Sequence, residues 1–182
     1  MKVIKNLVAA FSLKSEFAAR RNKLYRIAYS WSHDSALADD LVQETIYKAI
    51  KNASKLRDIE TIDTWLYRIL YNCWQDFLRV KGRNVEFVEI HDEGQADQSD
   101  NYQQSQIVLR VRSAIEQLPT SLREVVTLAD FAGFSYAEIA AITEIPIGTV
   151  MSRLFRARQN LKQQLLDFGS DDSVGYKLRS VK

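Results

Sequence analysis

The residues best suited to chemistry lie between Ile147 and Leu161, in the run IGTVMSRLFRARQNL. At helical spacing its apolar side chains form one stripe, which leaves small hydroxyls and arginines on the remaining surface. The stripe consists of Ile147, Val150, Leu154, Ala157 and Leu161, and the other surface carries Thr149, Ser152, Arg153, Arg156, Gln159 and Asn160. Hydroxyl and guanidinium groups suit the base edges of a DNA major groove, although an amphipathic core helix with solvated arginines fits the same pattern.

A shorter helix precedes this one, and a tight turn separates the two. Ser135 followed three residues later by Glu138 fits a capping box, which satisfies the exposed amides of a first helical turn. Pro146 blocks backward extension of a helix but favours one that begins at or just after it. The spacing therefore predicts a helix-turn-helix from Ser135 to Leu161.

The whole chain has an ordinary globular composition. Its 182 residues, 46% hydrophobic and 26% charged, allow one large domain or two small ones. No run approaches the roughly 18 apolar residues of a membrane span, and no cleavage pattern follows the N-terminal apolar patch, so we expect a cytoplasmic protein. The lone Cys73 is expected to be a buried structural thiol, and two histidines supply metal sites poorly, so no metal or cofactor is expected.

Charge is distributed unevenly along the chain. Lys and Arg outnumber Asp and Glu by 15 to 9 in residues 1–84 and by 10 to 8 in residues 106–182. Residues 85–105, in contrast, contain 6 Asp or Glu residues and no Lys or Arg. The acidic stretch is rich in Gln, Asp and Ser without helical periodicity after Ile90, which favours a flexible linker. Its carboxylates are equally compatible with a basic channel in a partner.

Helical periodicity on both sides of the linker predicts an all-α fold of two small domains. The N-terminal domain (1–84) is predicted to hold three helices: Glu16 to Trp31, one from Ser35, and one from Thr61 or Thr64 to Val80. The linker covers 85–104. The C-terminal domain (105–166) is predicted to hold four helices ending in the helix-turn-helix, and 167–182 a disordered tail. Ser121 and Glu124 suggest a second capping box, which opens a helix through about Phe131. The expected core residues of this helix are Val125, Val126, Leu128, Ala129 and Phe131.

The second predicted helix carries an acidic, amide and aromatic face opposite its core face. This face consists of Asp40, Gln43, Glu44, Tyr47 and Lys48. Its i, i+3, i+4 spacing is typical of a solvated surface, and the same cluster suits docking against a basic helical partner.

The third predicted helix combines a broad aromatic arc with a narrow polar stripe. Trp65 and Trp74 are best explained as core of a small bundle, whereas Tyr67 and Tyr71 lie at the edge of the arc. Arg68, Asn72 and Arg79 belong to the polar stripe. Aromatic rings beside Arg and Asn suit unpaired bases, so burial and single-strand binding both remain open for Tyr67, Arg68 and Tyr71.

Three ordered segments resemble bacterial sigma-70 family RNA polymerase sigma factors, specifically the extracytoplasmic-function (ECF) group. They are DDLVQETIYKAIKN, TWLYRILYNCWQDFLR and LPTSLREVVTLADFAGFSYAEIAAITEIPIGTVMSRLFRAR. The resemblance covers about residues 20–80 and 105–165. It implies a transcription initiation factor, not an enzyme, which binds core RNA polymerase and promoter DNA, has no small-molecule substrate and is held inactive by an anti-sigma factor.

The resemblance also implies roles for residues. The face of Asp40, Gln43, Glu44, Tyr47 and Lys48 would dock on the polymerase clamp helices, and the linker would thread into the polymerase. The minus-10 element would be melted by the third helix, through Trp65, Tyr67, Arg68, Tyr71, Asn72 and Arg79. The minus-35 element would be recognised by Thr149, Met151, Ser152, Phe155 and Arg156, with Arg153 and Arg158 near phosphates.

Two positions depart from the family pattern. Thr143-Glu144 replaces a common Leu-Gly before the Ile-Pro of the turn, and a non-glycine residue at positive φ costs on the order of 1–2 kcal/mol. Met151 stands where Lys or Arg is usual, so one cationic contact is missing and the preferred DNA sequence is expected to differ.

Two other classes of function are weighed against this one. A conventional helix-turn-helix regulator, whose N-terminal bundle binds an effector or dimerises, would bind duplex DNA unaided. An HD-type metal phosphohydrolase built on His33-Asp34, Asp39, Asp40 and Glu44 would need more than the two histidines present.

Overall fold

The computed structural model describes residues 2–56, 58–83 and 102–169, which form helices and turns without any strand. The N-terminal half contains α1 (Lys2–Ser32), α2 (Ser35–Lys51) and α3 (Ile62–Arg83), with two 3-10 turns, η1 (Ala53–Lys55) and η2 (Ile59–Thr61), before α3. Asp34 caps α2 by accepting a hydrogen bond from the amide of Leu37. The predicted three-helix bundle is confirmed, although α1 begins well before Glu16.

The C-terminal half contains four α-helices and one π-helical turn. These are α4 (Tyr102–Glu116), α5 (Thr120–Val126), the π turn η3 (Thr127–Phe131), α6 (Tyr136–Thr143) and α7 (Ile147–Gly169). The four expected helices are thus present. The predicted linker falls mainly on residues 84–101, and the tail mainly on 170–182, both outside the described residues. No helix among the described residues is long and apolar enough to cross a membrane.

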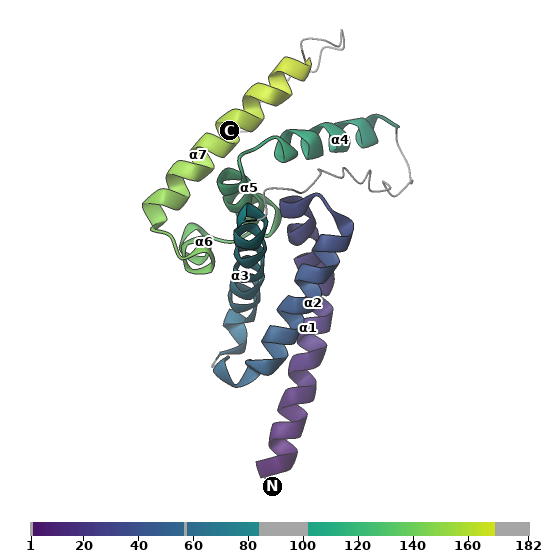
Figure 1. Cartoon of the computed structure of the whole chain (residues 1–182), viewed down its shortest axis with the longest axis vertical. Helices are drawn as coiled ribbons and strands as arrows, with labels where there is room; N and C mark the ends of the chain where they lie inside the picture. The colour runs from purple at the N-terminus through teal and green to yellow at the C-terminus, as the bar shows by residue number, and fades with distance from the viewer. Residues whose placement is uncertain (1, 57, 84–101, 170–182) are drawn as a thin grey trace, which may run out of the picture.

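The two halves pack against one another. Figure 1 shows α2 and α3 beside α1, with α5 and α6 against the upper part of α3, and α6 and α3 are in direct contact. Trp31 and Leu70 of the N-terminal half belong to the same continuous buried core as Leu128 and Leu154 of the C-terminal half. The burial of large apolar side chains, at roughly 25 cal/mol per Å² of apolar surface, therefore also holds the halves together.

Several polar groups form hydrogen bonds across the junction of the halves, although the buried Arg123 Nε has no partner among the described residues. Trp31 donates its indole Nε1–H to Thr127 Oγ1 at 2.8 Å, and Arg123 Nη1 donates to the Trp31 carbonyl at 2.8 Å. Glu124 is 3% exposed, and its Oε1 accepts from Trp74 Nε1 at 2.9 Å. Because unpaired buried polar groups are costly, these bonds fix how the C-terminal half sits on α1 and α3.

Three sequence predictions in the C-terminal half are wrong. Ser121 and Glu124 make no capping box, because α5 begins at Thr120 with Pro119 as an N-cap that lacks a side-chain bond, while the Glu124 carboxylate turns inward to α3. Phe131, expected in the core, is 60% exposed, since the π turn changes the helical register over Thr127–Phe131. Ile147 is 50% exposed, so the buried stripe of α7 begins at Val150.

Candidate nucleic-acid interface

The helix-turn-helix is built as its sequence predicts. Ser135 and Glu138 form a complete capping box at the start of α6. Glu144 ends α6 at φ 56°, in the left-handed region that favours glycine. The carbonyl of Pro146 accepts hydrogen bonds from the amides of Thr149 and Val150, which starts α7. Both helix ends at the turn are thus fixed locally.

One face of α7 is buried and the other is open. Val150, Leu154 and Ala157 are at most 1% exposed and anchor the helix on α5 and α6. On the opposite side Met151 is 52% and Phe155 66% exposed, and Ser152 and Arg156 are exposed beside them. Of the residues expected to contact the minus-35 element, only Thr149 and Arg153 are partly buried.

The three arginines of α7 have different surroundings. Arg158 Nη2 lies 2.6 Å from Asp130 Oδ1, and this hydrogen bond, followed by one with Tyr136, raises the pKa of Arg158. Arg153 is half-buried on the side of α7 that faces α3, where its charge acts on Tyr71 and Glu124. Arg156 is exposed and makes no ion pair with any described residue.

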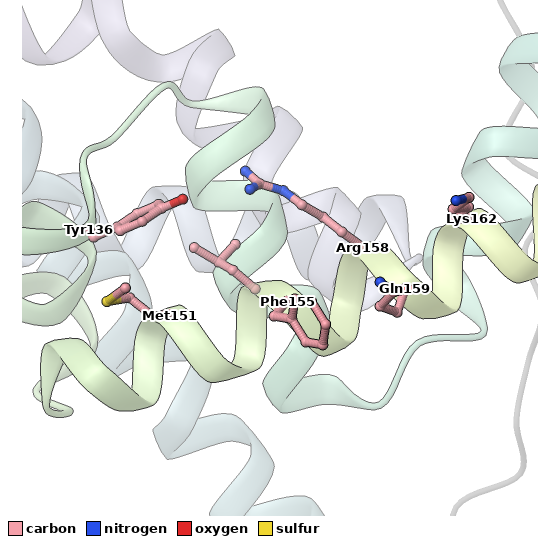
Figure 2. A pocket seen from close by; sticks show the side chains of 7 residues that line it. Tyr136, Met151, Phe155, Arg158, Gln159 and Lys162 are labelled. Carbon is pink, nitrogen blue, oxygen red and sulfur yellow. The ribbon is translucent and has the colours of Figure 1, made fainter. Parts of the chain in front are cut away.

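A shallow groove of about 390 Å³ runs along the open face. Figure 2 shows Tyr136 of α6 on one side and Met151, Phe155 and Arg158 along α7, with Gln159 and Lys162 farther along the helix. The groove therefore has apolar side chains near the start of α7 and polar or basic ones beyond them. Such a mixed surface suits the edges of base pairs together with nearby phosphates.

The α3 face expected to melt DNA is largely covered by the C-terminal half. Tyr67 is 4% exposed and meets the ring of Phe134 edge-on, with centroids 4.8 Å apart. Tyr71 is 9% exposed and packs edge-on against Trp31. Burial raises the pKa of each tyrosine to about 12, so both phenols are neutral at physiological pH.

The other members of this set lie around the two tyrosines. Trp65 is half-buried against Phe17, with ring centroids 6.1 Å apart. Arg68 forms an ion pair with Glu144 of the helix-turn-helix turn, so a cation of α3 is paired with the C-terminal half. Asn72 is exposed, and Arg79 is exposed with its Nη1 3.2 Å from Asp76 Oδ1.

A buried carboxylate lies at the centre of this contact. Glu124 Oε1 accepts hydrogen bonds from both Trp74 Nε1 and Gln75 Nε2, the latter at 2.8 Å. Burial raises the pKa of Glu124 above its ordinary 4.5, and the two hydrogen bonds and the nearby charges of Arg153 and Arg123 partly oppose that shift. The contact between the halves therefore contains a group whose ionisation is costly.

The α2 face is open. Asp40, Gln43 and Glu44 are exposed, and Tyr47 is 61% exposed. Lys48 Nζ lies 3.4 Å from Glu44 Oε1, 3.8 Å from Asp76 Oδ2 and 3.5 Å from the buried Cys73 Sγ. Burial raises the pKa of Cys73, as befits the expected structural thiol. No group of three or more His, Cys, Asp or Glu side chains in the described ranges is arranged to hold a metal ion.

Comparisons with known proteins match both halves to one family. The sigma-70 region 2 model matches residues 17–84, and the sigma-70 region 4 model matches residues 109–161. The ECF RNA polymerase sigma factor EcfG of Rhodopseudomonas palustris is 34% identical over 169 residues, which span 90% of this chain and 93% of that relative. This chain is an ECF sigma factor of the sigma-70 family. The sigma-H factor of Pseudomonas aeruginosa is 33% identical over 161 residues, covering 80% of this chain and 81% of the relative.

Solved structures agree with this assignment. The sigma factor RpoE of Bartonella quintana, in complex with the anti-sigma factor NepR, superposes with a TM-score of 0.73 at 31% identity, over 85% of this chain and 97% of that one. CnrH, in complex with the cytosolic domain of CnrY, superposes with a TM-score of 0.62 at 25% identity, over 88% of this chain and 96% of the CnrH chain. This sigma factor is a transcription initiation factor that directs core RNA polymerase to promoters, so the alternative of a polymerase-independent regulator is set aside.

Sequence reasoning missed the residues that join the two halves of this sigma factor. Glu124 was expected to cap a helix, and no role was expected for Arg123 or Thr127. One signal was available in the sequence: Glu124 follows Ser121 by three residues but is also next to Val125 and Val126. Beside these apolar residues, a carboxylate that points into the core was an alternative to a helix cap. Nothing in the sequence, however, indicates that its partner is Trp74, 50 residues away.

Proposed function

We propose that this sigma factor divides promoter recognition between its halves, the C-terminal domain recognising the minus-35 element with α7 and the N-terminal domain melting the minus-10 element with α3. The single observation that carries this division is the open face of α7, the second helix of the helix-turn-helix, where Arg156 is exposed and makes no ion pair with any described residue. Ser152 and Phe155 flank it on the same open face.

The proposal for α3 requires the halves to separate. Trp65, Tyr67, Arg68, Tyr71, Asn72 and Arg79 are the proposed minus-10 residues. In the packed arrangement Tyr67 and Tyr71 are almost completely buried and Arg68 is paired with Glu144. Unpaired bases stack on aromatic rings only when the rings are accessible, so α3 would melt DNA after polymerase has moved the C-terminal half away.

We further propose that Asp40, Gln43, Glu44, Tyr47 and Lys48 on α2 form the docking face for core polymerase. The exposed carboxylates and the exposed Tyr47 ring support this, because charge complementarity and an aromatic anchor are typical of protein interfaces. The protein would work in the cytoplasm by binding alone, without catalysis. An anti-sigma factor is a proposed partner, since both solved relatives described above are bound to such a protein or to a cytosolic domain.

Run-off transcription with core polymerase tests the proposed role of Arg156. We expect Arg156→Ala to weaken promoter-dependent initiation by about 1–3 kcal/mol, the worth of a bidentate contact with a base. Arg112→Ala, which removes an exposed arginine of α4 outside the proposed face, is the matched control. Equal activity of the two variants across promoter sequences would show that Arg156 makes no base contact.

Docking on polymerase has its own test. Asp40→Arg combined with Glu44→Arg should abolish co-purification with core polymerase, because it reverses two charges on the proposed face without touching the core. The control reverses the exposed Asp58 and Glu60, which lie before α3. Circular dichroism should show equal helicity for both variants. Retained co-purification of the first variant would place the docking face elsewhere.

A further inference from the structure

Three large apolar side chains form a row on the open face of α7. Ile147, Met151 and Phe155 follow one another at a spacing of four residues and are 50%, 52% and 66% exposed. Single exposed apolar residues are common on protein surfaces, but a contiguous row beside a groove marks a place where something binds. Met151 and Phe155 both line the groove of Figure 2.

The charged side chains of the same face favour duplex DNA as the partner, with an unusual balance between phosphate contacts and apolar contacts. Arg158 is held by Asp130, and Arg153 faces α3, whereas Arg156 makes no ion pair within the described ranges. Ser152 Oγ donates to the Thr149 carbonyl at 3.0 Å, so its proton is already engaged. Phosphate contacts depend on cations, and of the two that line the groove with Met151 and Phe155, Arg158 is paired with Asp130 and Lys162 lies farther along α7. Apolar contacts must therefore supply part of the recognition.

The position of the row fits the base edges. In a helix-turn-helix the N-terminal residues of the second helix lie deepest in the major groove. Met151 and Phe155 are the fifth and ninth residues of α7, and Arg156, the tenth, is exposed next to Phe155 in the sequence. Among the groups that base pairs present in the major groove, the methyl group of thymine is the apolar one.

We propose that Met151 and Phe155 recognise thymine methyl groups in the minus-35 element, next to a guanine bound by Arg156. This inference rests on the proposed function, because it takes α7 as the helix that enters the minus-35 major groove. It makes Met151, where a cation is usual in the family, a residue that determines specificity: the preferred element should contain thymines beside one guanine.

The experiment removes the methyl groups one at a time. Holoenzyme selects its preferred upstream element from a promoter library with a randomised minus-35 region, and each thymine of the selected element is then replaced by deoxyuridine, which lacks only the methyl group. At one or more positions we expect holoenzyme with the wild-type sigma factor to bind about fourfold more weakly, the worth of one buried methyl group. Deoxyuridine in the spacer serves as the DNA control.

The protein variants identify the residue that contacts each methyl group. Holoenzyme with Met151→Ala or Phe155→Ala should bind the thymine promoter more weakly and should lose its sensitivity to deoxyuridine at one specific position each. Leu166→Ala, which truncates a 50% exposed apolar residue farther along α7, should retain the full fourfold difference. All three side chains are exposed, so none of the variants should unfold.

The outcomes separate this inference from the proposed function. If selection returns a defined minus-35 element but no deoxyuridine position weakens binding, the methyl contacts are overturned while the proposed function stands. The methyl contacts are likewise overturned if the variants lose transcription without any change in deoxyuridine sensitivity, because the row then serves a protein contact. If selection returns no preferred minus-35 sequence, the proposed recognition of that element by α7 is itself contradicted.

Discussion

The open face of α7 and the covered face of α3 are both expected to bind promoter DNA, yet the fold treats them in opposite ways. On α7 the aromatic ring of Phe155 is 66% exposed, whereas on α3 the ring of Tyr67 is 4% exposed. Arg156, which is proposed to contact a base, makes no ion pair with the part of the chain that the structure describes, whereas Arg68 is paired with Glu144. A duplex can thus reach α7 without rearrangement, but bases can reach the aromatic rings of α3 only after the halves part.

Because of this difference, access of DNA to α3 costs free energy, whereas access of DNA to α7 does not. Contact with the minus-35 element requires no loss of buried surface. Exposing Tyr67, Tyr71 and Glu124 removes apolar burial and breaks several hydrogen bonds, which polymerase binding must offset. The packed arrangement therefore favours strand opening only when polymerase is present. Three experiments test this comparison, in order of decreasing expected effect.

Truncating one aromatic ring on each face gives the largest contrast. Tyr67→Ala should lower the free energy of unfolding by about 3 kcal/mol, because it leaves a cavity against Phe134. Phe155→Ala should change it by less than about 0.5 kcal/mol, since that ring is mostly in water. Urea unfolding followed by circular dichroism measures both values. Similar losses for the two variants would contradict the covered state of α3.

Glu124 should make the packed arrangement depend on pH. Because burial raises its pKa in the folded protein, its contribution to stability is complete below the ordinary value of 4.5 and is lost as pH rises through the raised pKa. Glu124→Gln keeps an oxygen that can accept from Trp74 and Gln75 without the charge. We expect it to raise the free energy of unfolding at neutral pH by about 1 kcal/mol.

Thermal unfolding across pH 4–8 measures this effect as the difference between the wild-type protein and the variant. The difference should grow as pH rises and vanish at the acid end, where Glu124 is neutral in both the folded and unfolded states. Glu60→Gln, which removes an exposed carboxylate of η2 before α3, is the control for removing a carboxylate. A constant difference across the range would mean that Glu124 does not titrate with the packing.

The smallest effect is expected at the turn between α6 and α7. Glu144→Gly should relieve about 1–2 kcal/mol of left-handed backbone strain and lose an exposed ion pair worth at most about 1 kcal/mol. The net result is a gain in stability of about 0.5–1 kcal/mol. Glu144→Gln keeps the strain and loses the charge, so it should be slightly less stable than the wild-type protein. Chemical denaturation distinguishes the two variants, and a loss of stability for Glu144→Gly would show that the ion pair outweighs the strain.

Local features of this sigma factor were largely predictable from its sequence. The capping box of Ser135 and Glu138 and the helix α3 were confirmed, because each depends on residues a few positions apart, although α3 continues past the predicted Val80 to Arg83. The open side of α7 was also anticipated for Met151 and Phe155. The assignments of individual residues to promoter elements and to polymerase stay predictions.

The same reasoning failed where distant segments compete for one side chain. Glu124 fits a local capping pattern, but Trp74 and Gln75 offer two buried donors that a cap would leave unpaired. Phe131 fits an apolar period, but the π turn rotates it outward. For Glu124, hydrogen bonds from α3 selected between two outcomes that the local pattern allowed, whereas for Phe131 the π turn changed the helical register.

By itself, the sequence determined the helices, the capping box of α6, the helix-turn-helix and the family, since these follow from periodicity and short spacings along the chain. Only the tertiary structure decided that the C-terminal half covers Tyr67 and Tyr71, and that Arg68 pairs with Glu144, 76 residues away. The physical reason is that burial and long-range pairing depend on how complete faces fit together, and no spacing along the chain encodes that fit.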